Sequence, residues 1–322
     1  MVSSSDIYRY IPAQLRDRKI TLDFLPKIAK KPEIIKEIEL AINQVPTSHK
    51  IIVNDARKVE LPTSSVHLVL TSPPYWNLKK YPDVTGQLGA IGNYRSFIDE
   101  LEKVWRNCYS AIVPGGRLIC VVGDVCLSRK LNYGTHTVIP LHSSIQENLV
   151  KVGFANLAPI IWFKISNAKY EAKGKTQFLG KPYEPGGIIK NDIEFIIMAR
   201  KPGAYRKVAP PNRILSVISE QNHKEWFNQI WSSLNGISTK LHPAPFPVQL
   251  AERLIRMFSF VGDVVLDPFM GTGSTNIAAL SWGRNSIGIE VYPPYVQIAL
   301  NRLREKANMF RDVTIETERN NE

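Results

Sequence analysis

The chain alternates short β-branched apolar runs with segments of helical periodicity, and this alternation constrains the fold more than any other feature. Seven runs are typical of strands: Ile51–Asn54, Val66–Thr71, Arg117–Gly123, Ala158–Phe163, Ile193–Ala199, Val264–Asp267 and Ser286–Glu290. Helical spacing recurs in Pro32–Ile42, Tyr94–Ala111, Thr137–Val152, Pro247–Phe258, Ser274–Trp282 and Pro294–Lys306. Strands that alternate with helices form mostly parallel sheets covered on both faces. We therefore expect an α/β, doubly wound domain with a mostly parallel seven-stranded sheet.

Three other parts of the chain interrupt this pattern. Residues 1–45 are basic and punctuated by prolines, and we expect them to be an N-terminal extension. Segments 164–191 and 200–241 mix Lys and Arg with aromatic residues, a combination that suits a phosphate backbone and its bases. The Pro-Gly-Gly tripeptides at 114–116 and 185–187 are typical of turns.

The charge balance favours a polyanionic partner. The 322 residues carry 41 Lys and Arg against 29 Asp and Glu, a formal net charge of +12. No apolar stretch of about 18 residues and no signal-peptide core occurs, so we expect a cytoplasmic protein without a membrane partner. The cysteines, Cys108, Cys120 and Cys126, are scattered and fit packing roles better than a metal site, and we expect no metal.

One motif indicates a nucleotide-like ligand. The strand VVLD ends at Asp267 and continues through a turn with Gly271 and Gly273 into a helix that begins at Ser274. Glycines let the backbone approach a ligand, and the first N–H groups of a helix bind anions. Glu290 ends the next strand 23 residues later, close to the spacing of about 20 at which a second acid contacts ribose hydroxyls.

A second motif, TSPPYW, directly follows the strand VHLVL. Pro73 and Pro74 stiffen the loop and leave carbonyl oxygens free as acceptors, while Tyr75 and Trp76 add aromatic faces. Such a loop at the carboxyl end of a strand suits a planar substrate with an exocyclic amino group.

Taken together, these motifs resemble those of the amino-methylating DNA methyltransferases that use S-adenosyl-L-methionine. The segments DPFMGTG with GIE, TSPPYW, PGGRLICVVGD and HPAPFPVQL carry the resemblance, which runs from about Asn54 to about Leu303. TSPPY precedes DPFMGTG, an order similar to the permuted β group. The resemblance implies a class I, Rossmann-like methyltransferase fold with a small target-recognition region.

The resemblance also implies roles for particular residues. The catalytic tetrapeptide would be Ser72, Pro73, Pro74 and Tyr75, with acceptors for the amino hydrogens and a ring that stacks on the base. The cofactor would be held by Asp55, Phe246, Asp267, Phe269, Gly271, Gly273, Ser274 and Glu290. Double-stranded DNA would be bound by Lys169, Lys173, Lys175, Lys181, Arg206 and Lys207.

The implied reaction is methyl transfer to an exocyclic nitrogen of a flipped base. Methylation at cytosine C5 is excluded because it needs a nucleophilic thiolate, and none of the three cysteines follows a proline in a suitable loop. Ser72 favours cytosine N4, because serine at this position goes mainly with that base in the family. Adenine N6 stays open as the alternative.

Other classes of protein fit the residues less well. A nicotinamide-dependent oxidoreductase would need a third glycine where Asn276 stands. A methyltransferase acting on RNA or on a protein amide shares the proline loop, and a non-catalytic DNA-binding protein shares the basic segments. The sequence leaves open the DNA site, a cognate restriction endonuclease and the choice between monomer and dimer.

We expect four parts along the chain. They are an N-terminal extension (1–45), the catalytic half of the methyltransferase domain (46–163), target-recognition segments with one core strand near 192–200 (164–241), and the cofactor-binding half (242–310).

Overall fold

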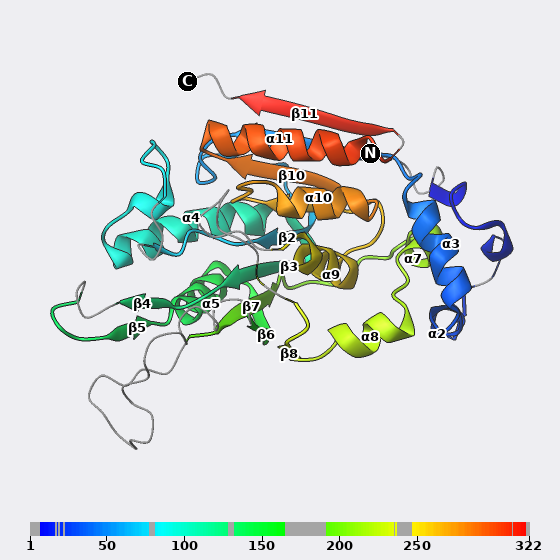
Figure 1. Ribbon diagram of the computed structural model, residues 1–322, viewed down its shortest axis with the longest axis horizontal. Helices are drawn as coiled ribbons and strands as arrows, with labels where there is room; N and C mark the ends of the chain where they lie inside the picture. Colours follow the sequence, from blue (N-terminus) through cyan, green and yellow to red (C-terminus); the bar gives the residue numbers. More distant parts are fainter. Residues whose placement is uncertain are drawn as a thin grey trace, which may run out of the picture.

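The computed structural model describes residues 7–16, 18, 20–21, 23–76, 81–127, 132–164, 191–234, 236, 247–310 and 312–319. Within them, the chain builds a nine-stranded sheet of order β11-β1-β10-β9-β2-β3-β7-β6-β8 (Figure 1). In chain order its strands are β1 (Thr47–Val53), β2 (Val66–Thr71), β3 (Ile112–Val122), β6 (Ala155–Phe163), β7 (Ile193–Arg200), β8 (Ile230–Trp231), β9 (Val264–Asp267), β10 (Asn285–Glu290) and β11 (Val313–Arg319). A separate hairpin pairs β4 (Val125–Leu127) with β5 (Thr137–Ile139).

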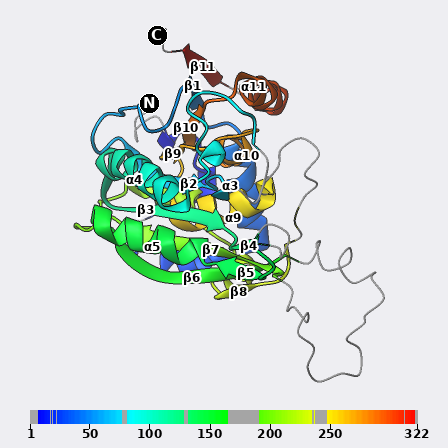
Figure 2. The same ribbon diagram turned by 90° about the vertical axis from the view of Figure 1, so that its left-hand side faces the viewer.

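Helices cover both faces of the sheet (Figure 2). One face packs against α4 (Tyr94–Ala111) and α5 (Leu141–Val152), and the other against α9 (Val248–Phe258), α10 (Ser274–Ser281) and α11 (Pro293–Ala307). The shorter helices are η1 (Ala13–Leu15), α2 (Phe24–Ala29), α3 (Pro32–Ile42), η3 (Leu88–Ala90), α7 (Pro210–Leu215) and α8 (Glu220–Trp226).

Strand β2 shows why a central strand is apolar along its length. Leu68 and Leu70 pack into the cluster with α9, while Val69 between them packs into the cluster with α4. All three are fully buried, because successive strand residues point to opposite faces and both faces are covered. Burial of each such side chain contributes roughly 1.5–3 kcal/mol.

The order of the strands creates a crevice between β2 and β9, which are parallel neighbours. The chain leaves β2 through α4 to β3 on one side, and leaves β9 through α10 to β10 on the other. Because these connections lie on opposite faces, the loops after β2 and β9 diverge. Ligands of α/β sheets bind at such a switch point, at the carboxyl ends of the strands.

The predicted α/β, doubly wound, mostly parallel fold is confirmed, although four strands escaped prediction: β4, β5, β8 and β11. Strands β4 and β5 have three residues each and β8 has two, and β11 is rich in Thr and Glu on an exposed edge, so none of them forms a long apolar run. Strands β6 and β7 run antiparallel to each other, and β7 runs antiparallel to β3.

Two local predictions were wrong. The tripeptide at 114–116 lies inside β3 rather than in a turn. Within β3, Gly115 has a φ of +78°, and the pairing with β2 shifts register. The helix expected from Thr137 begins at Leu141, because Pro140 is its N-cap and Thr137–Ile139 forms β5. The tripeptide at 185–187 lies outside the described residues.

The N-terminal residues help to build a third apolar cluster. Ile7, Ile11 and Ile38 pack there with Leu215 of α7 and Val261 before β9. Throughout the described ranges, every helix is too short or too polar to cross a membrane.

Candidate active site

A pocket opens at the carboxyl ends of the central strands. Both sequence motifs contribute to its wall, although nearly 200 residues separate them. Six of the predicted site residues line it: Asp55, Ser72, Pro73, Pro74, Phe269 and Glu290. Tyr81, Gln87 and Leu88, from the segment before α4, close one side.

A direct hydrogen bond joins the two motifs at the base of the crevice. The Thr71 hydroxyl donates to Oδ1 of Asp267 at 2.7 Å, and the Phe269 N–H donates to the same oxygen at 3.1 Å. Asp267 is 1% exposed, and this burial raises the pKa of its carboxyl to about 6 despite those hydrogen bonds. Asp267 therefore braces the turn from behind and is not part of the pocket wall.

Glu290 is held at the pocket wall by two backbone donors. The Gly271 N–H donates to its Oε2 and the Tyr292 N–H to its Oε1, both at 2.9 Å. Burial raises the pKa of Glu290 to about 7, against the effect of these hydrogen bonds. Among the described side chains, Glu290 has no cationic partner. The pocket therefore suits a ligand that brings positive charge or hydroxyl donors.

The glycine turn owes its shape to backbone conformations that favour glycine. Gly271 and Gly273 have φ values of +53° and +82°. Gly273 is the N-cap of α10, and Ser274 is the first helical residue, with its side chain buried. The predicted helix start at Ser274 is confirmed. The Gly271 N–H donates a hydrogen bond to Glu290, whereas Gly273 and Ser274 do not line the pocket.

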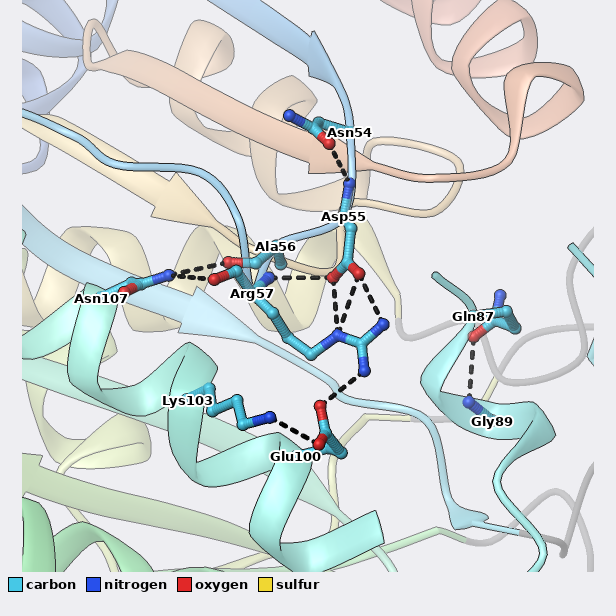
Figure 3. A network of polar contacts seen from close by, with 9 residues as sticks. All are labelled: Asn54, Asp55, Ala56, Arg57, Gln87, Gly89, Glu100, Lys103 and Asn107. Atoms are coloured by element: carbon cyan, nitrogen blue, oxygen red, sulfur yellow. Dashed lines mark hydrogen bonds and ion pairs between the residues drawn. The ribbon is translucent and has the colours of Figure 1, made fainter. Parts of the chain in front are cut away.

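Asp55 lies in a chain of alternating charges (Figure 3). Arg57 Nε donates to both carboxylate oxygens at 2.9 Å, and Arg57 Nη1 donates to Glu100 at 2.6 Å. Lys103 contacts the other oxygen of Glu100 at 2.6 Å. Hydrogen bonds from Arg57 to Asp55 raise the pKa of the guanidinium above its usual value. Arg57 thus orients the Asp55 carboxylate, and Asp55 also lines the pocket.

The tetrapeptide places a hydroxyl at the pocket and a phenol behind it. Ser72 donates to the Tyr75 hydroxyl at 3.3 Å, and that hydroxyl lies 3.5 Å from both the Val121 carbonyl and Glu194 Oε2. Tyr75 is 6% exposed, so its ring is covered here and its phenol contacts protein groups. Burial, with the Glu194 charge nearby, raises the pKa of Tyr75 and keeps the phenol protonated.

Several predicted residues lie elsewhere. The structure does not bring Arg206 and Lys207 to this pocket: Arg206 is paired with Asp263 before β9, at the amino ends of the strands. Five others lie outside the described residues: Phe246, Lys169, Lys173, Lys175 and Lys181.

Sequence reasoning missed several polar residues of the site. The pocket is also lined by Asn54, Tyr81, Gln87 and Tyr295, and predicted site residues form hydrogen bonds with Arg57, Thr71 and Glu194. Arg57 follows Asp55 by only two positions, and in the turn after β1 the two side chains form a hydrogen bond. Thr71 directly precedes Ser72, but nothing in the local sequence indicates that its hydroxyl donates to Asp267. Glu194 is a lone acid within the apolar strand β7, and Lys164 pairs with it at 2.7 Å. A charged residue inside a buried strand is the signal that could have identified it.

Comparisons with known proteins agree with this geometry. A family model for N6 and N4 DNA methylases matches residues 66–301. The type II methyltransferase M.MjaI of Methanocaldococcus jannaschii is 38% identical over 279 residues, which cover 77% of this chain and 88% of that protein.

Solved structures show the same architecture. A Thermus thermophilus protein described as a DNA modification methylase, solved in complex with S-adenosyl-L-methionine, is 45% identical with a TM-score of 0.69, over 85% of this chain and 99% of that one. The cytosine-N4-specific PvuII DNA methyltransferase is 19% identical with a TM-score of 0.56, over 85% and 98%, and shares the fold. With both motifs meeting in one pocket and the family model spanning most of the sequence, this chain belongs to the family of N6/N4 DNA methylases.

Proposed function

We propose that the protein transfers a methyl group from S-adenosyl-L-methionine to the exocyclic N4 amino group of cytosine in double-stranded DNA. The observation that carries this proposal is the meeting of Ser72 and Pro73 with Glu290 and Phe269 around one pocket. An amine acceptor loop and an acidic cofactor wall then face each other, as direct in-line transfer requires.

The donor set of the pocket fits this cofactor. Asp55 and Glu290 are acceptors for an adenine amino group and ribose hydroxyls, and Phe269 offers an aromatic face beside them. Glu290 lacks a cationic partner among the described residues, which suits a ligand that carries positive charge. The Thermus relative, at 45% identity, supports the assignment because it was solved with this molecule. When bound, S-adenosyl-L-methionine supplies an electrophilic methyl group.

The tetrapeptide would make the amino nitrogen nucleophilic. Its lone pair is delocalised into the base, so a site must localise it. The Ser72 hydroxyl donates to Tyr75, which leaves the serine oxygen free to accept an amino hydrogen. The Pro73 carbonyl would accept the other. These acceptors stabilise the positive charge that develops on nitrogen, and Tyr75, anchored beside Glu194, would hold Ser72 in place.

The DNA must deliver an extruded base, because the duplex hides the amino group. We propose that Lys169, Lys173, Lys175 and Lys181 contact phosphates, since they follow Lys164 in sequence and Lys164 pairs with Glu194 beside Tyr75. In this proposal, residues 46–163 and 242–310 form the two halves of the methyltransferase domain and 164–241 recognise the target.

The preference for cytosine over adenine rests on Ser72. The relative named as cytosine-N4-specific shares only the fold at 19% identity and adds nothing to this choice. Adenine N6 is the alternative acceptor, because a hydroxyl accepts a hydrogen bond from either amino group.

The test is methylation of unmodified plasmid DNA with isotopically labelled S-adenosyl-L-methionine, followed by nucleoside mass analysis. We expect labelled N4-methylcytosine. Labelled N6-methyladenine alone would overturn the choice of base but not the reaction. Failure to bind the cofactor in isothermal titration would overturn the enzyme assignment and favour a non-catalytic DNA-binding protein.

A further inference from the structure

A second pocket, of about 500 Å³, opens at the opposite edge of the sheet, at the amino ends of β2, β3 and β9. It is lined by His67, Gly116, Arg117, Tyr205, Arg213 and Asp263, among others. His67 and Ser72 occupy the two ends of β2, so the two pockets lie about 16 Å apart along the strand. This second pocket is therefore separate from the methyl-transfer site.

Positive charge dominates this second pocket. Four cationic side chains line it, Arg117, Arg206, Lys207 and Arg213, against the single carboxylate of Asp263. Asp263 is already committed: it pairs with Arg206 through both oxygens and accepts the Phe260 N–H at 2.8 Å. The described residues supply no acidic partner for the other three cations.

Arg117 carries the strongest sign of a missing ligand. Its Nε is buried and has no hydrogen-bond partner within the described structure. Arg117 also lies directly opposite Arg200 in the antiparallel pairing of β3 and β7, and the Nε of Arg200 is likewise buried and unpaired. Like charges opposite each other destabilise a sheet, and an unpaired buried donor adds a further cost. An anion bound to Arg117 would reduce the repulsion and supply a partner for its Nε.

The rim of the pocket adds a planar surface and a neutral donor. Tyr205 is 70% exposed, and the Arg200 guanidinium lies 4.3 Å from its ring centroid. His67 Nδ1 accepts the Val264 N–H at 3.0 Å, so the proton of the neutral ring sits on Nε2. Burial lowers the pKa of His67 and keeps the ring neutral. Arginines beside an exposed aromatic ring bind a phosphate together with a stacked base.

We propose that this pocket is a second binding site, for the phosphate of a nucleotide, with Arg117 and Arg213 as the main anion ligands and Tyr205 as the stacking surface. The phosphate can belong to a free nucleotide or to a DNA strand. The site does not depend on methyl transfer and would exist even if the proposed reaction were wrong.

The experiment uses the full chain and the variant Arg117→Gln/Arg213→Gln. The control is Lys31→Gln/Lys36→Gln, which removes the same charge from exposed positions of and beside α3. Inorganic pyrophosphate is titrated calorimetrically, and binding of a 40-base-pair duplex is followed by fluorescence anisotropy at several salt concentrations. We expect the pocket variant to lose pyrophosphate affinity at least tenfold and the control to keep it.

The two arms distinguish the source of the phosphate. If DNA occupies the pocket, the variant also lowers the salt dependence of duplex binding by about two phosphate contacts, roughly 0.9 each in the logarithmic slope. If the slope is unchanged while pyrophosphate binding is lost, the ligand is a free nucleotide. Unaltered binding of both probes, or no binding of pyrophosphate to the parent, overturns the proposal.

Thermal unfolding separates binding from a structural role. Because Arg117 has no ion pair to lose and faces Arg200, we expect the pocket variant to unfold no earlier than the parent without ligand. With pyrophosphate present, only the parent and the control should gain in Tm. A variant that unfolds much earlier without ligand would mean that the arginines serve the fold, and the proposal would fail.

Discussion

The hydroxyl of Thr71 lies 2.7 Å from Oδ1 of Asp267 and joins two strand ends that are 196 residues apart in the chain. Through it, the loop that begins at Ser72 is connected to the turn that carries Phe269. Because β2 and β9 are parallel neighbours, both motifs line one pocket.

We expect Thr71→Val to destabilise the protein. The substitution preserves shape but leaves the buried Asp267 carboxylate with one donor fewer, which costs about 1–3 kcal/mol. Urea unfolding measures the change. Thr71→Ser, which keeps the hydroxyl, should recover most of the stability, and a valine variant as stable as the parent would show that the bond contributes nothing.

The contribution of Asp267 and Glu290 to stability should fall as pH rises from about 4 to 7. Asp267 and Glu290 have pKa values raised from 3.8 and 4.5 to about 6 and about 7. The folded state therefore holds these protons more tightly than the unfolded state. Their contribution is fully present below pH 4 and is lost as pH passes through the raised values. Urea unfolding across this range should show that Glu290→Gln gains stability relative to the parent as pH rises, whereas the difference between the exposed Glu305→Gln and the parent should not change with pH.

Replacing the Ser72 hydroxyl should affect turnover more than binding. Ser72→Ala removes one acceptor for the amino hydrogens, and loss of one such group commonly lowers kcat about 10²- to 10³-fold. Steady-state methylation and cofactor titration measure the two effects separately. Ser96→Ala, on the exposed surface of α4, is the matched control. Equal kcat values for both variants would contradict the proposed role of Ser72.

Removing Arg57 should weaken cofactor binding. Arg57 holds the Asp55 carboxylate through hydrogen bonds to both of its oxygens (Figure 3), and without them this carboxylate, which lines the pocket, is no longer kept in one orientation. We expect Arg57→Gln to raise the Kd for S-adenosyl-L-methionine about tenfold, while kcat at saturation changes little. Lys103→Gln, at the exposed outer end of the chain of charges, should leave the Kd unchanged. A kcat that falls with no change in Kd would assign Arg57 a different role.

Much of the fold followed from local patterns. The buried strands and long helices were predictable because apolar periodicity depends on neighbouring residues alone, as in Leu68, Val69 and Leu70 of β2. Strands β8 and β11 were not, since their partners across the sheet define them rather than an apolar run of their own.

The candidate site divides in the same way. The sequence by itself determined which groups the two loops carry: the Ser72 hydroxyl, the prolines, the glycine turn and the acids Asp267 and Glu290. Only the tertiary structure decided how these groups are used. It placed Asp267 behind the wall, bound Asp55 to Arg57, set Glu194 beside Tyr75 and moved Arg206 to the far edge. Residue type and spacing specify chemistry within one loop, whereas hydrogen bonds between distant strands depend on sheet order and burial, which no local pattern encodes.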